Sequence, residues 1–198
     1  MADKYANFAA LARSEASPGT WRIQQVARRD SNVLIIAPHG GRIEHGTSEL
    51  AVEIAGEDYS FYCFEGLKAH GNRDLHITSH AFDEPRALSL AAQCAVVVGV
   101  HGCAGDNSIY VGGLDVPLVA LITAALAQHG LPASSESHPY PAINPLNICN
   151  RGSRNRGAQL EVSYDLRLDA PHEIARAVRT AIAAHVEDTI EPGSPGSD

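Results

Sequence analysis

Two apolar runs in this sequence each end in a histidine that is followed by a glycine. Residues 33–38 lead into His39, residues 96–100 lead into His101, and Glu44 follows His39 with four residues between them. Two histidines and one carboxylate are the protein ligands of a zinc site that keeps one coordination position open. A lone histidine at a strand end is usually a packed imidazole, but the combination with Glu44 favours metal ligands. The sequence therefore predicts a hydrolytic zinc centre if His39, Glu44 and His101 converge.

Glu161 is the candidate for the base that a zinc-activated water requires. It lies in the strand-like segment 159–163, between Leu160 and Val162. A carboxylate inside a strand needs a charged partner, a metal ion or a function. An ion pair with Arg156 or Arg167 on a half-exposed strand would satisfy it equally well, so the spacing leaves both interpretations open.

The segment 150–157 holds the densest group of basic residues in an otherwise acidic chain, Arg151, Arg154 and Arg156. Arginine binds carboxylates through two parallel hydrogen bonds. Three arginines in a loop rich in glycine and asparagine, directly before Glu161, predict a clamp for an acidic substrate. The alternative is a solvated loop that offsets nearby acidic residues.

The remaining reactive residues give weaker signals. His76 and His80 occur in a polar segment and are candidates to line the same cleft. The four cysteines form no CxxC pair, so we expect buried thiols instead of a disulfide framework or a thiolate metal site. There is no GxSxG nucleophile elbow and no GxGxxG or phosphate-binding loop. The five histidines expected at the surface or in loops are His70, His129, His138, His172 and His185.

Strand and helix patterns alternate along the chain, which predicts an α/β fold with a central mixed, mostly parallel sheet flanked by helices. In such sheets the ligand crevice lies at the carboxyl ends of the strands. Strands are expected at 21–26, 33–38, 59–64, 75–79, 95–100, 108–111 and 159–163. Helices are expected at 46–55, 83–93, 115–128 and 171–186, and an ordered loop at 134–147.

Composition excludes several classes of protein. The net charge of −8 argues against a nucleic-acid or anionic-membrane surface, and no apolar stretch is long enough to span a bilayer. The first 20 residues lack the apolar core of a signal peptide, so we expect a cytoplasmic protein, with release on lysis left open. A single domain over residues 1–190 and a flexible tail over 191–198 are expected.

Several segments match a known family in order and with similar spacing, from about residue 20 to residue 170. They are APHGGRIEHGTSELA, YCFEGLK, LHITSHAFDEP, VVVGVHGCAG, VGGLD and NICNRGSRNRGAQLEVSYDLR. Together they resemble the zinc-dependent poly-γ-glutamate hydrolases of bacteriophages and bacterial chromosomes, whose members were once labelled phage-related replication proteins. That family is similar to the zinc carboxypeptidases, so the resemblance implies a single α/β domain with a central mixed sheet.

The resemblance also implies roles for the candidate residues. It makes His39, Glu44 and His101 the zinc ligands and Glu161 the general base. It implies that Asn150 and Arg151 are the Asn-Arg pair that binds a substrate carboxylate. It also implies that one arginine polarises the scissile carbonyl, with Arg154 and Arg156 as candidates and Arg151 as a further one.

We therefore expect a monomeric hydrolase that cleaves γ-glutamyl amide bonds of poly-γ-glutamate through a zinc-activated water. A zinc amidohydrolase or carboxypeptidase for small acyl-amino acids or peptides would use the same site, and only the substrate length would differ. A non-catalytic binding or replication-accessory protein is the alternative from a different class. The acidic charge and the complete set of site residues argue against it.

Overall fold

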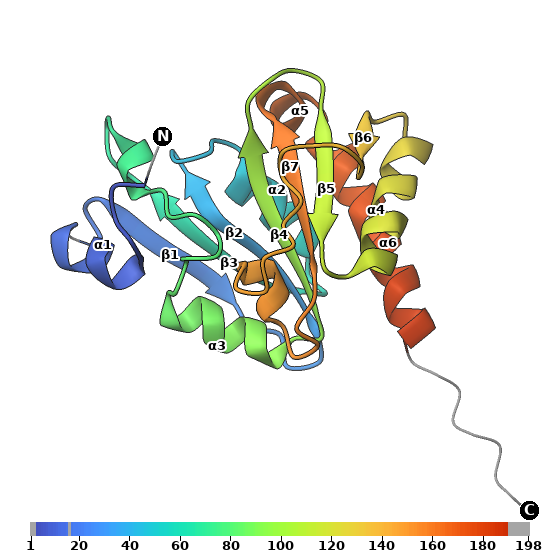
Figure 1. Cartoon of the computed structure of the whole chain (residues 1–198), viewed down its shortest axis with the longest axis horizontal. Coiled ribbons are helices and arrows are strands. Elements are labelled where there is room, and N and C mark those ends of the chain that lie inside the picture. The colour runs from blue at the N-terminus through green and yellow to red at the C-terminus, as the bar shows by residue number, and fades with distance from the viewer. Residues whose placement is uncertain (1–2, 16, 190–198) are drawn as a thin grey trace, which may run out of the picture.

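Strands and helices alternate in the computed structural model, which describes residues 3–15 and 17–189. Within these residues the strands are β1 (Trp21–Val26), β2 (Val33–Gly41), β3 (Ser60–Gly66), β4 (Val96–Cys103), β5 (Ile109–Gly113), β6 (Ala133–Ser134) and β7 (Ala158–Ser163). They form one seven-stranded sheet in the order β1-β3-β2-β4-β7-β5-β6 (Figure 1). Within the described residues, two pairs of neighbouring strands are antiparallel, β1 with β3 and β5 with β7, and the other pairs are parallel.

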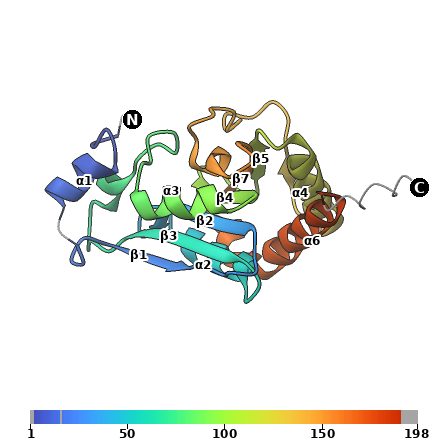
Figure 2. The ribbon, with the colours of Figure 1, turned by 90° about the horizontal axis from the view of Figure 1, so that it is seen from below.

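Helices cover both faces of the sheet (Figure 2). In the same part of the chain they are α1 (Phe8–Ser14), α2 (Thr47–Ala55), α3 (Pro85–Gln93), α4 (Val116–Gln128), α5 (Tyr164–Asp169) and α6 (Pro171–Thr189). Two short 3-10 helices are η1 (Asn72–Leu75) and η2 (Ile148–Arg151). Helix α6 packs against both α2 and α4 on one face, while α3 lies on the opposite face (Figure 2).

The central strands are buried on both faces, which explains their continuous apolar sequence. In β2, Ile35 and Ala37 point into the core beneath α2, α4 and α6. Leu34 and Ile36 point into a second core on the α1 and α3 side. All four of these side chains are fully buried.

The structure confirms the predicted α/β class and most of the predicted elements. The confirmed strands are those predicted at 21–26, 33–38, 59–64, 95–100, 108–111 and 159–163. The confirmed helices are those predicted at 46–55, 83–93, 115–128 and 171–186. The predicted tail, residues 191–198, lies outside the described residues.

The strand predicted at 75–79 is wrong. Leu75 ends η1, and the residues after it form no strand. The alternating pattern arises because Leu75 and Ile77 bury their side chains in the second core. Asp3 holds the backbone of the next residue, Thr78. Its carboxylate accepts hydrogen bonds from the backbone N and the hydroxyl of Thr78, both at 2.6 Å. Helix α5 was not predicted, because six residues are too few to show a helical period.

Parallel pairing places the functional residues at one edge. Strands β2, β4 and β7 are neighbours and run in the same direction, so their carboxyl ends meet at the same edge of the sheet. His101 on β4 is directly opposite Glu161 on β7. None of the described helices has the length and apolar character needed to cross a membrane.

The packing of α6 predicts a large stability loss for Ile182→Ala. The Ile182 side chain is fully buried in the core beneath α2, α4 and α6, so truncation leaves a cavity. We expect the free energy of unfolding to fall by about 2 to 5 kcal/mol in urea titrations. The neighbouring exposed residue provides the control, since Ala183→Ser should change it by no more than about 0.5 kcal/mol. Equal stabilities of the two variants would contradict this packing.

Candidate metal centre

The loop after β2 brings Glu44 back to His39. The backbone N of Glu44 donates a hydrogen bond to the carbonyl oxygen of His39 at 2.9 Å. The hydroxyl of Thr47, the first residue of α2, donates to the carbonyl oxygen of Glu44 at 2.8 Å. Gly46 has a φ of 88°, which glycine adopts without the strain that a side chain would add. The segment between β2 and α2 therefore forms a tight loop at the carboxyl end of β2.

The end of β4 adds His101 to this pair. The Nδ1 atoms of His39 and His101 lie 3.1 Å apart. Glu44 Oε1 lies 3.2 Å from His39 Nδ1, and Glu44 Oε2 lies 3.8 Å from His101 Nδ1. One ligand atom from each residue thus lies within 4.8 Å of the others, an arrangement that could hold one metal ion. The structure brings together the three residues that the sequence predicts as ligands.

The outer nitrogens of both imidazoles contact protein groups. His39 Nε2 lies 2.7 Å from the carbonyl oxygen of Ile77, and His101 Nε2 lies 3.3 Å from the hydroxyl of Ser79. Because a carbonyl oxygen only accepts hydrogen bonds, His39 Nε2 carries the hydrogen, and in the neutral ring Nδ1 is the free acceptor. Metal-binding histidines are typically oriented in this way. The donor set of two imidazoles and a carboxylate therefore fits zinc.

The charges at this cluster favour a bound cation. Burial acts to raise the pKa of Glu44, but His39 and His101 outweigh it and lower this pKa to about 2. Burial acts to lower the pKa of His39, but the Glu44 carboxylate outweighs it and raises this pKa above its usual value. Burial, and then the charge of His39, lower the pKa of His101 to about 3. Glu44 therefore stays ionised at neutral pH, and its negative charge favours a cation at this cluster.

Glu161 lies beside the cluster as a buried carboxylate. Its side chain is on β7 opposite His101, and the residue is 8% exposed. Its Oε1 accepts a hydrogen bond from Gln159 Nε2 at 2.9 Å. Burial, and then the Glu44 carboxylate, raise the pKa of Glu161 to about 8, while the charge of Arg167 acts in the opposite direction. Glu161 therefore holds a proton more tightly than an exposed glutamate does.

The ion pair considered for Glu161 does not form among the described residues. Arg156 Nε instead lies 3.2 Å from Oδ2 of Asp115, a buried residue that caps α4. Arg167 donates to backbone carbonyl oxygens and makes no ion pair with a described carboxylate. Of the two interpretations that the sequence leaves open, the geometry favours a carboxylate available for chemistry.

The candidate ligands and Glu161 line a cleft of about 690 Å³. The segments 73–80, 101–104 and 139–147 form its walls. His76 and His80 both line the cleft, as the sequence suggested. The ring of His76 stacks on His39 with centroids 4.0 Å apart, and its Nδ1 lies 2.7 Å from Asp3 Oδ1.

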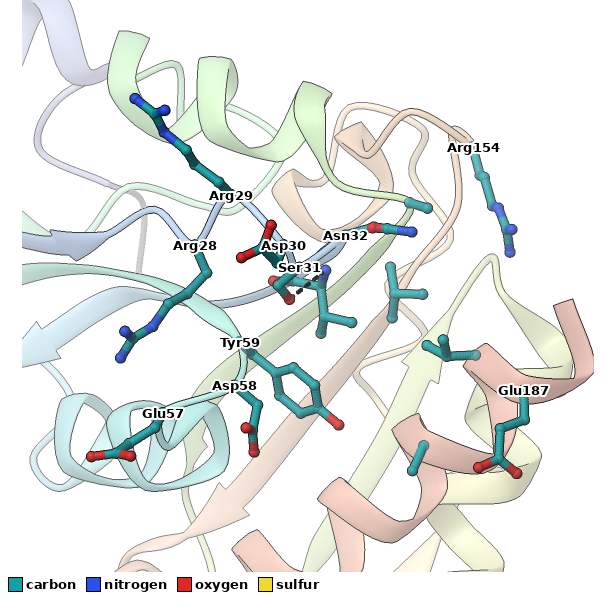
Figure 3. A pocket seen from close by; sticks show the side chains of 15 residues that line it. Arg28, Arg29, Asp30, Ser31, Asn32, Glu57, Asp58, Tyr59, Arg154 and Glu187 are labelled. Atoms are coloured by element: carbon teal, nitrogen blue, oxygen red, sulfur yellow. Dashed lines mark hydrogen bonds between the residues drawn. The ribbon is translucent and has the colours of Figure 1, made fainter. Parts of the chain in front are cut away.

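The predicted arginine clamp is not assembled at this cleft. None of Arg151, Arg154 and Arg156 lines it. Arg151 ends η2, and Arg156 is engaged with Asp115. Arg154 lines a different cavity of about 930 Å³, at the opposite end of β2 and β4 (Figure 3). The loop that carries the arginines runs from the cleft side to this opposite end before it enters β7, so it spreads their charges apart.

Asn150 is buried and bound to the backbone. Its Oδ1 accepts hydrogen bonds from the backbone N of Leu114 at 3.3 Å and of Gly157 at 3.1 Å. Its Nδ2 donates to the carbonyl oxygens of Ala142 at 2.8 Å and Asn144 at 3.0 Å. All these contacts join loop segments, so Asn150 holds the wall of the cleft in place and does not itself line the cleft.

Arg73 is the basic side chain that the sequence analysis missed. The described residues that line the cleft include no other arginine or lysine, and Arg73 is exposed. Its positive charge acts to lower the pKa of His39 and of His76. It lies in the short 3-10 helix η1 next to Asp74, so local charge density gave no signal.

Two further expectations are tested by burial. His185 was expected at the surface or in a loop, but it is buried in α6, and its Nε2 lies 3.3 Å from Asp115 Oδ2. The four cysteines are buried and unpaired, as predicted. Burial raises the pKa of Cys103, which lines the cleft, to about 11, so this thiol stays protonated near neutral pH.

Fold and site together define an α/β protein with a candidate metal centre of two histidines and a glutamate. A family model described as poly-γ-glutamate hydrolase matches residues 5–187. The chain therefore belongs to the poly-γ-glutamate hydrolase family.

The chain is also similar to individual proteins and solved structures. The structure of a bacteriophage poly-γ-glutamate hydrolase has a TM-score of 0.89 and 30% identity, covering 94% of this chain and 99% of that chain. A structure described as zinc-free YndL has a TM-score of 0.83 and 35% identity, covering 96% of this chain and 100% of that chain. YmaC of Bacillus subtilis (strain 168) is 43% identical over 168 residues, which are 83% of this chain and 71% of YmaC.

The raised pKa of Glu161 predicts how the stability of the metal-free protein depends on pH. The pKa is about 8 in the folded chain against a usual value of 4.5, so the folded state binds this proton more tightly than the unfolded state. The free energy of unfolding therefore falls as the pH rises through this window, by at most about 1.4 kcal/mol per pH unit. Glu161→Gln removes this titration, so the variant should gain stability over the wild type as the pH rises.

Urea unfolding of the chelator-treated proteins on both sides of neutral pH measures this difference. Glu187→Gln, at an exposed position on α6, is the matched control and should track the wild type at both pH values. A stability difference between Glu161→Gln and the wild type that is independent of pH would contradict the raised pKa.

Proposed function

We propose that this chain is a zinc-dependent hydrolase that cleaves the γ-glutamyl amide bonds of poly-γ-glutamate. Its family supports the reaction and the substrate. The observation that carries the proposal is the convergence of His39, Glu44 and His101 within 4.8 Å, next to the buried carboxylate of Glu161. The description of the related YndL structure as zinc-free supports zinc as the metal.

In the proposed reaction, the protein holds the ion and moves one proton. His39 and His101 would hold zinc through Nδ1, and Glu44 through its carboxylate. Zinc, when bound, supplies Lewis-acid chemistry that makes a water acidic near neutral pH and polarises a carbonyl. Glu161 takes the proton of the attacking water and gives it to the leaving amine nitrogen as the C–N bond breaks. The products are a free γ-carboxyl group and a free amine.

The environment of Glu161 suits this role. A base works best when its pKa is close to the working pH, and burial and Glu44 raise the pKa of Glu161 to about 8 in the metal-free chain. The amide of Gln159 donates to Oε1 at 2.9 Å and fixes the orientation of the carboxylate. The second carboxylate oxygen of Glu161, Oε2, would then accept the hydrogen bond from the attacking water.

Arg73 is the residue that we propose to bind the α-carboxylates of the polymer. Poly-γ-glutamate carries a negative charge on every residue, whereas the cleft already contains Glu44 and Glu161. A polyanion therefore needs a cation at the cleft, and Arg73 is the arginine that lines it. This assignment takes the place of the clamp of Arg151, Arg154 and Arg156.

The proposal is tested by the length of the polymer. The purified protein is loaded with zinc and incubated with high-molecular-weight poly-γ-glutamate, with and without a chelator, and the product size is followed on a gel. Shortening that the chelator abolishes is the expected result. Unchanged polymer, together with cleavage of short glutamyl amides, would replace the polymer by small acyl-amino acids as the substrate.

Glu161→Gln should keep zinc and lose hydrolysis. The amide preserves the shape of the side chain but takes no proton, so we expect the rate of polymer shortening to fall by about 10²- to 10⁴-fold. Zinc content is measured on the same samples by atomic absorption and should equal that of the wild type. Near-normal activity with bound zinc would remove Glu161 from the proposed mechanism.

Arg73→Ala should weaken substrate binding, and Arg154→Ala should not. A charge-assisted hydrogen bond contributes about 1.5 kcal/mol, which corresponds to a rise in KM of about tenfold for Arg73→Ala. Arg154 lines the cavity at the opposite end of the strands, so its removal should leave KM unchanged (Figure 3). Steady-state kinetics on one polymer preparation compare the two variants, and the reverse result would return substrate recognition to the loop 150–157.

A further inference from the structure

A buried guanidinium, that of Arg167, contacts all three chain segments that carry the proposed site. Arg167 lies on α5, the short helix after β7, and is 6% exposed. Its Nε donates a hydrogen bond to the carbonyl oxygen of His45 at 2.7 Å. Its Nη1 donates to the carbonyl oxygen of Val162. A side chain added at Gly102 would overlap this guanidinium, so the group lies directly against the backbone of β4.

These three contacts share one relation to the site. His45 follows Glu44, Gly102 follows His101, and Val162 follows Glu161, in each case as the next residue. The guanidinium therefore touches the backbone one residue beyond two proposed ligands and the proposed base. Its planar fork sets fixed directions for the hydrogen bonds from Nε and Nη1, which a lysine ammonium does not. One planar group thus contacts three separate segments.

The backbone of β4 extends this arrangement to the Glu44 side chain. Gly102 donates its backbone N to Glu44 Oε2 at 2.8 Å. Arg167 packs against Gly102 on the same stretch of strand, so a shift of the guanidinium moves this donor as well. The ring of Tyr164 lies over the guanidinium, with 5.7 Å between the ring centroid and Cζ.

The charge of Arg167 is not used in an ion pair. Among the described residues no carboxylate pairs with it, and the hydrogen bonds above go to backbone oxygens. Burying a charged group without an oppositely charged partner costs free energy. A purely structural tie between backbone segments would not require such a group, whereas a site that must hold two carboxylates close together benefits from a fixed positive charge.

We propose that Arg167 is the positioning residue of this site, which fixes Glu44, His101 and Glu161 relative to one another through the backbone residue that follows each of them. This inference rests on the proposed metal centre. It predicts that Arg167 governs metal affinity and metal geometry without touching the ion.

Arg179 provides a matched control for a structural arginine. Its Nη1 donates to the carbonyl oxygens of Ile54 at 2.9 Å and Ala55 at 3.0 Å, at the end of α2 and away from the cleft. Its Nη2 also pairs with Asp58, so Arg179→Lys removes guanidinium contacts with backbone oxygens and with a carboxylate. It therefore reports the general cost of losing such a tie.

The experiment compares Arg167→Lys, Arg179→Lys and the wild type as full-length chains. The zinc dissociation constant is measured by competition with a chromophoric chelator, and the cobalt-substituted proteins are compared by visible absorption. We expect the zinc dissociation constant of Arg167→Lys to rise about 10- to 100-fold and its cobalt bands to shift. Arg179→Lys should match the wild type in both readouts. If Arg167→Lys fails to fold, Gly102→Ala takes its place in the experiment. This variant keeps the arginine but displaces it, so it should show the same loss of zinc affinity and the same shift of the cobalt bands.

Each other outcome overturns the inference. Wild-type zinc affinity and unshifted cobalt bands in Arg167→Lys or Gly102→Ala would leave Arg167 as a structural residue while the metal centre stands. An equal loss in Arg179→Lys would show that any such tie has this effect. A wild type that binds no zinc would overturn the metal centre itself and this inference with it.

Discussion

The parallel pairing of β2 with β4 is the constraint on which the candidate site depends. Residues Val33–Ile36 pair with Val96–Gly99 in a direction that sends both strands to the same edge of the sheet. Both strands are apolar and buried, so a shift in register would expose core side chains or bury polar ones. This register brings the Nδ1 atoms of His39 and His101 to 3.1 Å from each other. Antiparallel pairing would place the two imidazoles at opposite ends of the sheet.

Two carboxylates near this edge, the half-buried Glu44 and the buried Glu161, differ in their surroundings. Glu44 lies next to both imidazoles and accepts a hydrogen bond from Gly102, so its pKa is lowered to about 2. Glu161 has no such cation in contact, and burial and Glu44 raise its pKa to about 8. Neighbouring acids whose environments separate their pKa values commonly divide the roles of ligand or stabiliser and of proton carrier. This separation supports the roles proposed above, with Glu44 as a ligand and Glu161 as the base.

The sequence predicted what depends on strand burial and missed what depends on loop paths. His39, Glu44 and His101 could be found because each follows or lies close to the end of an apolar strand. The surroundings of the arginine loop could not be read from spacing, because Arg151, Arg154 and Arg156 are close in sequence while the loop carries them to different parts of the structure. Arg73 and Arg167 are the opposite case. Each is an isolated arginine whose position depends on tertiary contacts, so local spacing gave no signal for Arg73 and only an ion-pair alternative for Arg167.

In the proposed site, His39 and His101 both bind one zinc ion through Nδ1, and Glu44 is the third protein ligand. A crystal grown with zinc, measured on both sides of the zinc absorption edge, tests it most directly. We expect one anomalous peak about 2.0 to 2.2 Å from both Nδ1 atoms and a Glu44 oxygen, with His39 Nε2 still bonded to the Ile77 carbonyl oxygen. A peak bound through Nε2, a peak at other residues, or no peak in zinc-saturated crystals would contradict it.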